Sequence, residues 1–276
     1  RDPYRILVSE YMLQQTQVSR VLSMYPLFLS RFPTTRALAS ASQRQVLRTW
    51  QGMGYNNRAV RLHRAARAIV GGRAGRFPRE YKALIALPGV GKYTAHAILV
   101  FAFDRQLPVV DLNIRRVLSR VFWRMRSRAD LRHEDDIWEL AAHILPNNRA
   151  GVWNHALMDF GAIICTARKP SCDRCPIANH CLSRPSMSRP TPQVSRNEPS
   201  FWGTPNRIYR GWIVKRLCLL PDGQSTPLDT LGASIAPGFT ERNRQWLIRL
   251  LEDLETDGLV RLRGNGAFHT RRVSLA

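Results

Sequence analysis

The segment that most constrains the fold runs from residue 80 to residue 113 and contains a glycine-flanked turn. The turn reads Leu-Pro-Gly-Val-Gly-Lys over residues 87–92, with apolar runs on both sides. Two glycines around one apolar residue permit a tight turn between helices, and they leave N–H groups at the start of the second helix without partners. A phosphate can bind those amides and the positive end of the helix dipole without any base being read. An ordinary corner between two helices is the alternative interpretation.

The charge of the chain favours a polyanionic partner. Among 276 residues there are 42 Lys+Arg against 20 Asp+Glu, a formal net charge of +22. Nucleic acid is the first candidate for such a field, although the strong preference for arginine over lysine can partly reflect genomic composition. No run of about 18 apolar residues is present, so we expect no membrane span. We also expect no signal peptide and a cytoplasmic, nucleoid-associated protein, in a sequence that opens at Arg1 without a methionine.

Helical periodicity predominates up to about residue 185, which predicts a mostly α body. We expect helices over 5–31, 35–41, 45–50, 58–69, 137–145 and 153–164, with a break or kink at Pro26. Residues 184–206 carry five prolines among polar residues, a composition typical of a linker. Residues 207–276 predict three helices and a β-hairpin, with strands over 259–263 and 268–273, which resembles a winged helix.

Four of the five cysteines are packed into one short segment. Cys165, Cys172, Cys175 and Cys181 are spaced C-x6-C-x2-C-x5-C, which predicts a metal centre rather than disulfides. Four thiolates suit either zinc or a [4Fe–4S] cluster, and the spacing by itself leaves both open. Cys218 lies on an apolar helix face, where we expect a small core residue.

Two carboxylates are candidates for acid–base chemistry. Glu10 lies in an apolar helix, where burial favours its protonated form, and a surface glutamate is the alternative. Asp111 follows the second helix of the hairpin, and the N-cap of a helix that begins at Leu112 is its alternative. Two carboxyl groups in different surroundings suit proton donation by one and charge stabilisation by the other.

The sequence resembles the helix-hairpin-helix glycosylase superfamily, and within it the MutY-type adenine glycosylases, from residue 1 to about 184. The matching stretches are residues 9–18, 50–55, 87–91 and 110–113 and the four cysteines. The resemblance implies a [4Fe–4S] cluster and a monomeric enzyme bound to double-stranded DNA with a mispaired base. It implies a two-lobed body over 1–183, with a helical barrel lobe at about 17–108 and a second lobe formed by the N-terminal segment and 109–183. The linker at 184–206 and a winged-helix-like domain at 207–276, which touches DNA or a protein partner, complete the expected organisation.

The resemblance also implies roles for individual residues. Glu10 protonates the adenine ring, Asp111 stabilises the sugar cation or its covalent adduct, and Asn113 orients the sugar or the attacking water. Tyr93 stands where lyase members carry a Schiff-base lysine, which implies base removal alone. The resemblance further implies that the adenine is flipped out of the duplex and that Gln15 and Tyr55 are wedge residues in contact with the opposite guanine. The residues expected to contact DNA are Gln14, Gln15, Thr16, Gln17, Tyr55, Arg58, Leu87, Gly89, Val90, Gly91 and Lys92.

Other functions stay open on the sequence. Tyr93 also suits a thymine or uracil glycosylase for G·T or G·U mispairs, and a lyase using Lys92 is a further alternative. A non-catalytic iron–sulfur DNA-binding protein and a winged-helix transcription regulator belong to different classes. Asn56 stands where many MutY-type enzymes have a second tyrosine, and the tail differs from the Nudix-like domain that reads 8-oxoguanine. The expected substrate is adenine opposite 8-oxoguanine or guanine.

Overall fold

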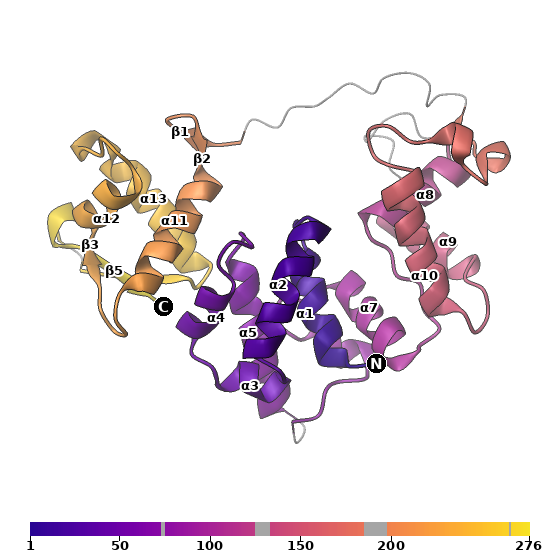
Figure 1. Ribbon diagram of the computed structural model, residues 1–276, viewed down its shortest axis with the longest axis horizontal. Coiled ribbons are helices and arrows are strands. Elements are labelled where there is room, and N and C mark those ends of the chain that lie inside the picture. The colour runs from indigo at the N-terminus through magenta and orange to yellow at the C-terminus, as the bar shows by residue number, and fades with distance from the viewer. Residues whose placement is uncertain (73–74, 125–132, 185–197, 265) are drawn as a thin grey trace. The chain divides into compact units, whose positions relative to one another are not determined.

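The computed structural model describes residues 1–72, 75–124, 133–184, 198–264 and 266–276 (Figure 1). The chain forms two compact units, each assembled from segments that are distant in the sequence. Unit 1 comprises Arg1–Ile6, Arg79–Ala86 and Val90–Ser195, and unit 2 comprises Leu7–Pro78, Leu87–Gly89 and Arg196–Ala276. Most described residues are helical, so the mostly α expectation is confirmed. The division into body, linker and tail stays a prediction.

The helical part of unit 2 surrounds an apolar core. Its helices are α1 (Pro3–Leu13), which begins in unit 1, α2 (Val18–Arg31), α3 (Thr35–Ser40), α4 (Gln43–Thr49) and α5 (Asn57–Gly71). Side-chain caps start two of them: Thr34 accepts from the Ala37 N–H, and Ser42 forms a capping box with Gln45. Phe28 and Trp50 are fully buried and meet edge to face, with ring centroids 5.8 Å apart.

Of the break or kink predicted at Pro26, the break is wrong, because the helix is interrupted earlier, between Leu13 and Val18. α1 ends at Leu13 and α2 begins at Val18, and Pro26 lies inside α2. Gln15 adopts the left-handed conformation with φ 53°, which a helix cannot continue through. Pro26 is exposed, so water can bond the carbonyl that the missing proline N–H leaves unpaired.

Unit 1 contains the second half of the glycine turn and the cysteine loop. Its helices are α6 (Tyr81–Ile85), α7 (Lys92–Phe103), α8 (Leu112–Phe122), α9 (Glu134–His143) and α10 (Ala150–Asp159). A π-helical turn, η3 (Phe160–Ile164), extends α10 toward Cys165. Ile114 and Leu118 of α8 pack against Ile137 and Trp138 of α9 in one apolar cluster. α8 is therefore held along its buried face, and its first turn is presented at one end of the cluster.

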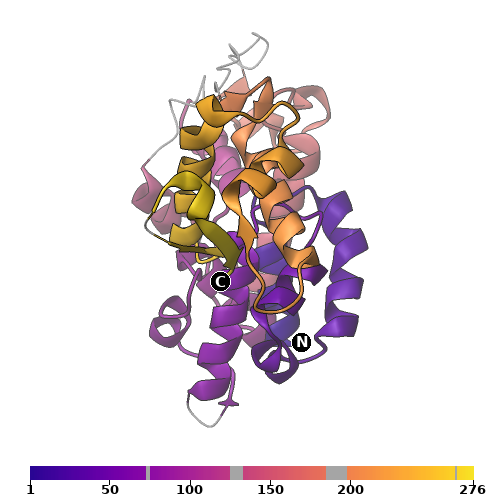
Figure 2. The ribbon, with the colours of Figure 1, turned by 90° about the vertical axis from the view of Figure 1, so that its left-hand side faces the viewer.

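The C-terminal part of unit 2, coloured orange to yellow in Figure 2, has the element order of a winged helix. Its elements are β1 (Ser200–Phe201), β2 (Thr204–Pro205), α11 (Asn206–Leu219), β3 (Thr226–Pro227), α12 (Leu228–Ile235), α13 (Arg244–Thr256), β4 (Val260–Arg263) and β5 (Arg272–Leu275). The last three strands form an antiparallel sheet in the order β3-β5-β4. We refer to residues 198–276 as the C-terminal domain.

The predicted strand over residues 268–273 is wrong in its position. Phe268–Thr270 form a short 3₁₀ turn, and the second strand of the wing begins only at Arg272, which pairs with Arg263. Phe268 lies near Phe239, with ring centroids 6.3 Å apart, and the Arg244 guanidinium sits 5.0 Å from its ring. These contacts hold Phe268 out of the strand. Within the described ranges, no helix combines the length and the apolar character needed to cross a membrane.

Candidate active site and cysteine loop

Asp111 caps helix α8 in unit 1. Its Oδ1 accepts a hydrogen bond from the Ile114 N–H at 2.7 Å, so the N-cap interpretation is confirmed. Its Oδ2 accepts a hydrogen bond from Nδ2 of Asn113 at 2.9 Å. Each carboxylate oxygen therefore has a fixed donor, and the cap does not compete with a catalytic role. A carboxylate that stabilises a cation must itself be held in one orientation, and these bonds provide that.

A hydrogen-bond chain connects Asp111 to the cysteine loop. Nη2 of Arg116 donates to Oδ1 of Asn113 at 3.0 Å and to the carbonyl of Gly161 at 2.6 Å. Nε of Arg116 donates to the carbonyl of Cys165 at 3.0 Å. Gly161 leaves no room for a side chain, because a Cβ there would lie 2.8 Å from Cβ of Asn113. The orientation of Asp111 thus depends on the backbone that leads into the first cysteine.

The four cysteines provide a uniform set of sulfur donors. Cys165 follows the π-helical turn, and the other three flank the short turns η4 (Cys172–Arg174) and η5 (Ala178–His180). Burial raises the pKa of the Cys172 thiol, and the negative charge of the other three thiols raises it further. The four sulfurs are therefore near enough to repel one another when ionised.

A buried arginine compensates the charge of this loop. Arg120 is 4% exposed, and its Nη1 lies 3.4 Å from Sγ of Cys165 and donates to the carbonyl of Thr166 at 2.7 Å. Four cysteine sulfurs beside a guanidinium fit an iron–sulfur cluster. No three His, Cys, Asp or Glu side chains in the described ranges gather tightly enough to hold a single ion. In a four-iron cluster each cysteine binds a different iron, so its ligands are more widely spaced than those of one ion.

Glu10 lies in unit 2, on α1. It is buried, with 8% of its surface exposed, beside Leu7 and Tyr11, which are fully buried. The surface-glutamate alternative is therefore wrong. A buried carboxyl group at this position is a candidate proton donor.

Two loops of unit 2 are tied together by Arg58. This side chain is 5% exposed and donates to the carbonyls of Tyr11 and Met12, both at 3.0 Å, and to Oγ1 of Thr16 at 2.8 Å. It also donates to the carbonyl of Gln14 and to those of residues 53–55. Burial lowers its pKa to about 10, so the guanidinium stays charged at neutral pH. The sequence analysis placed Arg58 among the DNA contacts. In the structure its side chain is buried between the two loops and bonded to both.

The loops themselves carry strained and exposed residues. Gln15 and Tyr55 both adopt left-handed backbone conformations, with φ 53° and 45°, and such strain persists only where the surroundings impose it. The Tyr55 side chain is 47% exposed. A cavity of about 320 Å³ beside the loops is lined by Gln17, Arg20 and Gly52, among others. Polar and aromatic groups of this kind suit contact with unstacked bases.

The glycine turn is shaped by close backbone packing. Gly89 has φ 81°, and a Cβ there would lie 2.9 Å from the Tyr11 hydroxyl, which donates to the carbonyl of Pro88. Gly91 occupies the N-cap of α7 and offers no side-chain cap to the first amides of that helix. These amides are the kind of donors that bind a phosphate. Val90 is nearly buried, as is Leu87.

The residues that follow the turn differ in their surroundings. Nζ of Lys92 lies 4.4 Å from the Trp138 ring centroid and 4.0 Å from Oδ1 of Asp135, so its charge is engaged by α9. Tyr93 packs against the apolar cluster that contains Val100 and Phe101 of α7.

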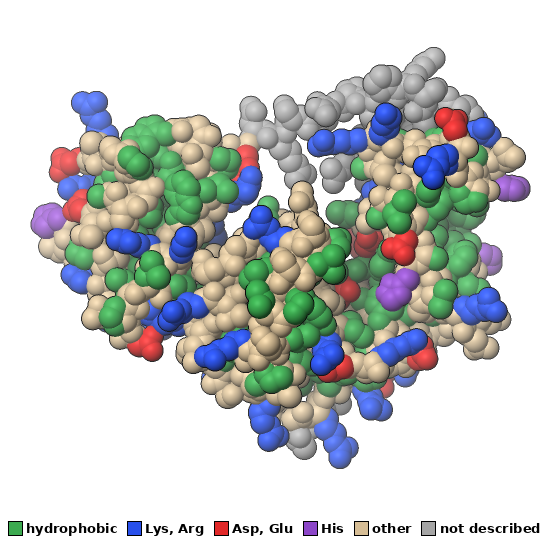
Figure 3. Space-filling view, viewed as in Figure 1, with side chains coloured by type: hydrophobic (Ala, Val, Ile, Leu, Met, Phe, Trp, Pro, Cys, Tyr) green, Lys and Arg blue, Asp and Glu red, His purple; other side chains and the backbone are tan. Residues whose placement is uncertain are grey.

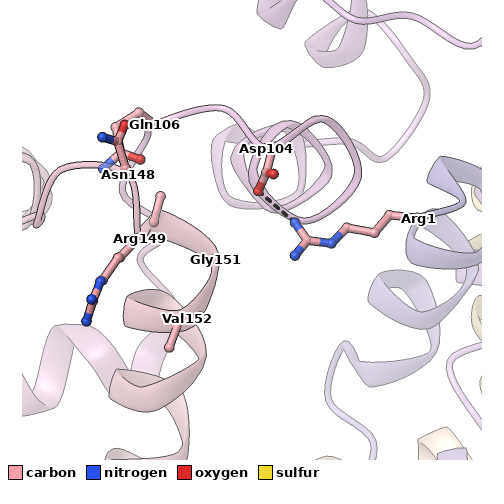
Figure 4. A pocket seen from close by; sticks show the side chains of 8 residues that line it. Arg1, Asp104, Gln106, Asn148, Arg149, Gly151 and Val152 are labelled. Carbon is pink, nitrogen blue, oxygen red and sulfur yellow. Dashed lines mark hydrogen bonds and ion pairs between the residues drawn. The ribbon is translucent and has the colours of Figure 1, made fainter.

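A cavity in unit 1 is lined by other residues (Figure 4). It has a volume of about 380 Å³ and is lined by Asp104, Gln106, Asn148 and Arg149 among others, with an ion pair of 2.7 Å between Arg1 and Asp104. It contains none of the candidate residues.

Unit 1 gathers one part of the predicted site, and unit 2 gathers the other. The first holds Asp111, Asn113, Tyr93, the start of α7 and the cysteines; the second holds Glu10, residues 14–17 and Tyr55. Sequence reasoning missed Arg116 and Arg120. Their signal is the helical spacing from Asn113, since Arg116 lies three residues further along α8 and Arg120 one turn beyond it.

Comparison with known proteins defines the class first. Residues 8–143 match the model of the HhH-GPD superfamily of base excision DNA repair proteins, and residues 165–181 match the iron–sulfur binding domain of endonuclease III. A thermostable thymine-DNA glycosylase has 33% sequence identity and a TM-score of 0.62 over 67% of this chain and 85% of its own. An endonuclease III bound to DNA, at 22% identity, has a TM-score of 0.61 over 68% of this chain and 87% of its own, and shares the fold.

The more similar sequences narrow the class. The adenine DNA glycosylase of Mycolicibacterium smegmatis is 39% identical over 96% of this chain and 86% of its own length, and that of Mycobacterium tuberculosis is 37% identical over 97% and 85%. The human adenine DNA glycosylase is 40% identical over 67% of this chain and 34% of its own length. The chain therefore belongs to the adenine DNA glycosylase family of the HhH-GPD superfamily. Its four cysteines hold a [4Fe–4S] cluster.

Proposed function

We propose that this protein is a monofunctional DNA glycosylase that hydrolyses the N-glycosidic bond of adenine mispaired with 8-oxoguanine or guanine. The observation that carries the proposal is the similarity to adenine DNA glycosylases over 96% of the chain, C-terminal domain included. The partner is double-stranded DNA, bound by a cytoplasmic monomer. Basic residues outnumber acidic ones by 42 to 20, and those on the face drawn in Figure 3 are spread over it.

Glu10 and Asp111 divide the chemistry between them. Glu10 donates its proton to the adenine ring, and the ring leaves with the electrons of the C1′–N bond. The sugar then carries positive charge at C1′, and the Asp111 carboxylate stabilises that charge. Water adds at C1′ and loses a proton, which completes hydrolysis. Burial of Glu10 and the two fixed donors on Asp111 equip the pair for these opposite tasks.

Asn113 and Arg116 act as positioning residues in this proposal. Both side-chain atoms of the Asn113 amide are engaged, one by Asp111 and the other by Arg116. When bound, the cluster cross-links the four cysteines, and Arg116 connects that loop to Asp111. Tyr93 cannot form an imine with the sugar, so the product retains an intact abasic strand.

The DNA is held by the turn and the two loops. The first amides of α7, at Gly91 and Lys92, bind a backbone phosphate, and Leu87, Gly89 and Val90 shape the turn around it. Gln14, Gln15, Thr16 and Gln17 enter the space left by the flipped base, and Tyr55 meets the opposite base. Arg58 positions both loops from below instead of touching DNA.

A mispair panel tests the proposed function. Purified protein is incubated with duplexes that carry A opposite 8-oxoguanine, A opposite G, T opposite G and U opposite G, and abasic sites are cleaved with alkali. We expect release of adenine from the first two duplexes only, and no product trapped by borohydride. Release of thymine without adenine would instead support the activity of the thymine-DNA glycosylase that shares 33% identity with this chain.

A further inference from the structure

The C-terminal domain is docked on helices α4 and α5 within unit 2, and Arg44 of α4 forms the centre of the contact. Its Nη1 donates to the carbonyls of Leu217 at 3.2 Å and Leu220, and its Nη2 donates to that of Pro221 at 3.2 Å. Its Nε lies 2.5 Å from Oδ1 of Asp222. The last carbonyls of a helix lack partners within that helix, and its C-terminal end attracts cations. Arg44 thus caps α11 from a distant part of the chain.

Further contacts fall on both sides of the Tyr55 loop. Nε2 of Gln51 lies 3.9 Å from Sγ of Cys218, and Nδ2 of Asn57 lies 3.5 Å from Oδ1 of Asp257. The other oxygen of Asp257 pairs with Arg210 of α11. Residues 51 and 57 flank the loop that links α4 to α5, so the C-terminal domain contacts this loop at its beginning and at its end.

The loop between these contacts has an unfavourable backbone conformation. Gly52 and Gly54 have φ 90° and 71°, and Tyr55, which is not a glycine, has φ 45°. Left-handed conformations of residues with side chains persist only where neighbouring structure fixes them. Arg58 of α5 holds the loop by hydrogen bonds to its carbonyls. The C-terminal domain holds it through the contacts at Gln51 and Asn57.

The charge of the winged helix disfavours DNA reading through α13. The exposed residues in the second half of this helix include Glu252, Asp253 and Glu255, which repel phosphates. Asp253 and Asp257 are engaged by Arg210. The acidic residues at this end of α13 therefore fit the contact with α4 and α5 better than insertion into a DNA groove.

We infer that the C-terminal domain is a buttress that fixes residues 51–57 and so positions Tyr55, with Arg44 and Asp257 as positioning residues. The role of Tyr55 at the base opposite adenine rests on the proposed function. The contact between the C-terminal domain and residues 51–57 does not depend on that function. Loss of the contact should loosen the loop and weaken binding of the mispair more than it slows base release in the saturated complex.

Amide hydrogen exchange of the full chain tests this inference. Arg44→Gln should raise exchange at least about tenfold in residues 217–222, where the cap is lost, and in residues 51–57. Arg31→Gln, in the last turn of α2 and exposed, is the control and should leave both segments unchanged. Arg44→Lys should restore part of the protection. Asp257→Ala removes the acceptor of the second contact and leaves Arg44 in place, and it should loosen residues 51–57.

The same variants are then compared on DNA. We expect the Kd for a duplex with A opposite 8-oxoguanine to rise about fivefold in Arg44→Gln, with a change of less than twofold in the saturated rate of adenine release. Faster exchange at 217–222 with unchanged exchange at 51–57 would overturn the inference that the C-terminal domain fixes this loop. Unchanged exchange in both segments would overturn it as well. A wild-type protein that releases no adenine would overturn the proposed function instead, since the exchange comparison does not depend on turnover.

Discussion

The two units hold their parts of the proposed site by different means. In unit 1, Asp111 is oriented through Asn113 and Arg116, and this chain ends on the carbonyl of Cys165. In unit 2, the loops at residues 14–16 and 53–55 are tied by hydrogen bonds from Arg58. The comparison teaches that the cluster should matter for chemistry at the sugar, whereas DNA contact by the unit 2 loops should be independent of it.

Asp111→Asn should give the largest difference between the effects of the two units on rate and on DNA affinity. The substitution retains a side-chain oxygen for the Ile114 cap but removes the negative charge beneath the sugar. We expect single-turnover adenine release to fall by about 10³-fold or more, with DNA affinity within about twofold. Tyr55→Ala should give the opposite pattern, weaker affinity with a smaller loss of rate. Equal loss of affinity in both variants would break the comparison.

Replacement of Arg58 should have the largest effect on stability. Arg58→Met leaves several loop carbonyls without their donor, and such losses cost about 3 kcal/mol in buried networks. Thermal and denaturant unfolding measure this cost. Arg67→Met, exposed further along α5, serves as the control and should change stability by less than about 0.5 kcal/mol. Iron content should remain that of the wild type, since the change is confined to unit 2.

Arg116→Gln should produce a smaller and more local effect. It removes the connection between Asn113 and the carbonyls of Gly161 and Cys165. We expect adenine release to slow about tenfold while DNA affinity stays the same, because a misoriented carboxylate stabilises the sugar cation less well. Arg124→Gln, exposed just beyond the end of α8, is the control. An Arg116 variant with the wild-type rate would show that Asp111 needs no support from the cysteine loop.

Lowering the pH should reduce the free energy of unfolding of both units by a modest amount. Burial lowers the pKa of His63 in unit 2 and of His96 in unit 1 below the usual 6.5, so both are neutral in the folded protein. Below pH 6.5 the unfolded chain binds protons that the folded chain does not, so stability falls as pH drops, by at most about 1.4 kcal/mol per pH unit for each histidine. Denaturant unfolding between pH 7.5 and 5.5 should show this slope. His96→Asn should reduce this slope.

The sequence predicted local features better than buried ones. The spacing of the cysteines and the glycine turn are local patterns, and the comparisons confirm the cluster. Asp111 caps α8, as the alternative interpretation of the sequence predicted. The positioning roles of Arg44 and Arg58 could not be predicted, because the carbonyls that these side chains bind lie mostly on segments distant in the sequence.

The errors have the same origin in tertiary packing. Pro26 remains inside a helix because its side of α2 faces water, and the chain breaks at Gln15 instead. Phe268 matched a strand pattern, but its contacts with Phe239 and Arg244 hold it in a turn.

The measurement that tests the central claim most directly is a double-mutant cycle on Glu10 and Asp111, with single-turnover adenine release as the readout. If both carboxyl groups act in the same bond-breaking step, Glu10→Gln and Asp111→Asn should each reduce the rate by about 10³-fold or more, and the double variant should lose little beyond the slower single variant. Retention of the wild-type rate in either single variant, in a folded protein that binds DNA normally, would contradict the account.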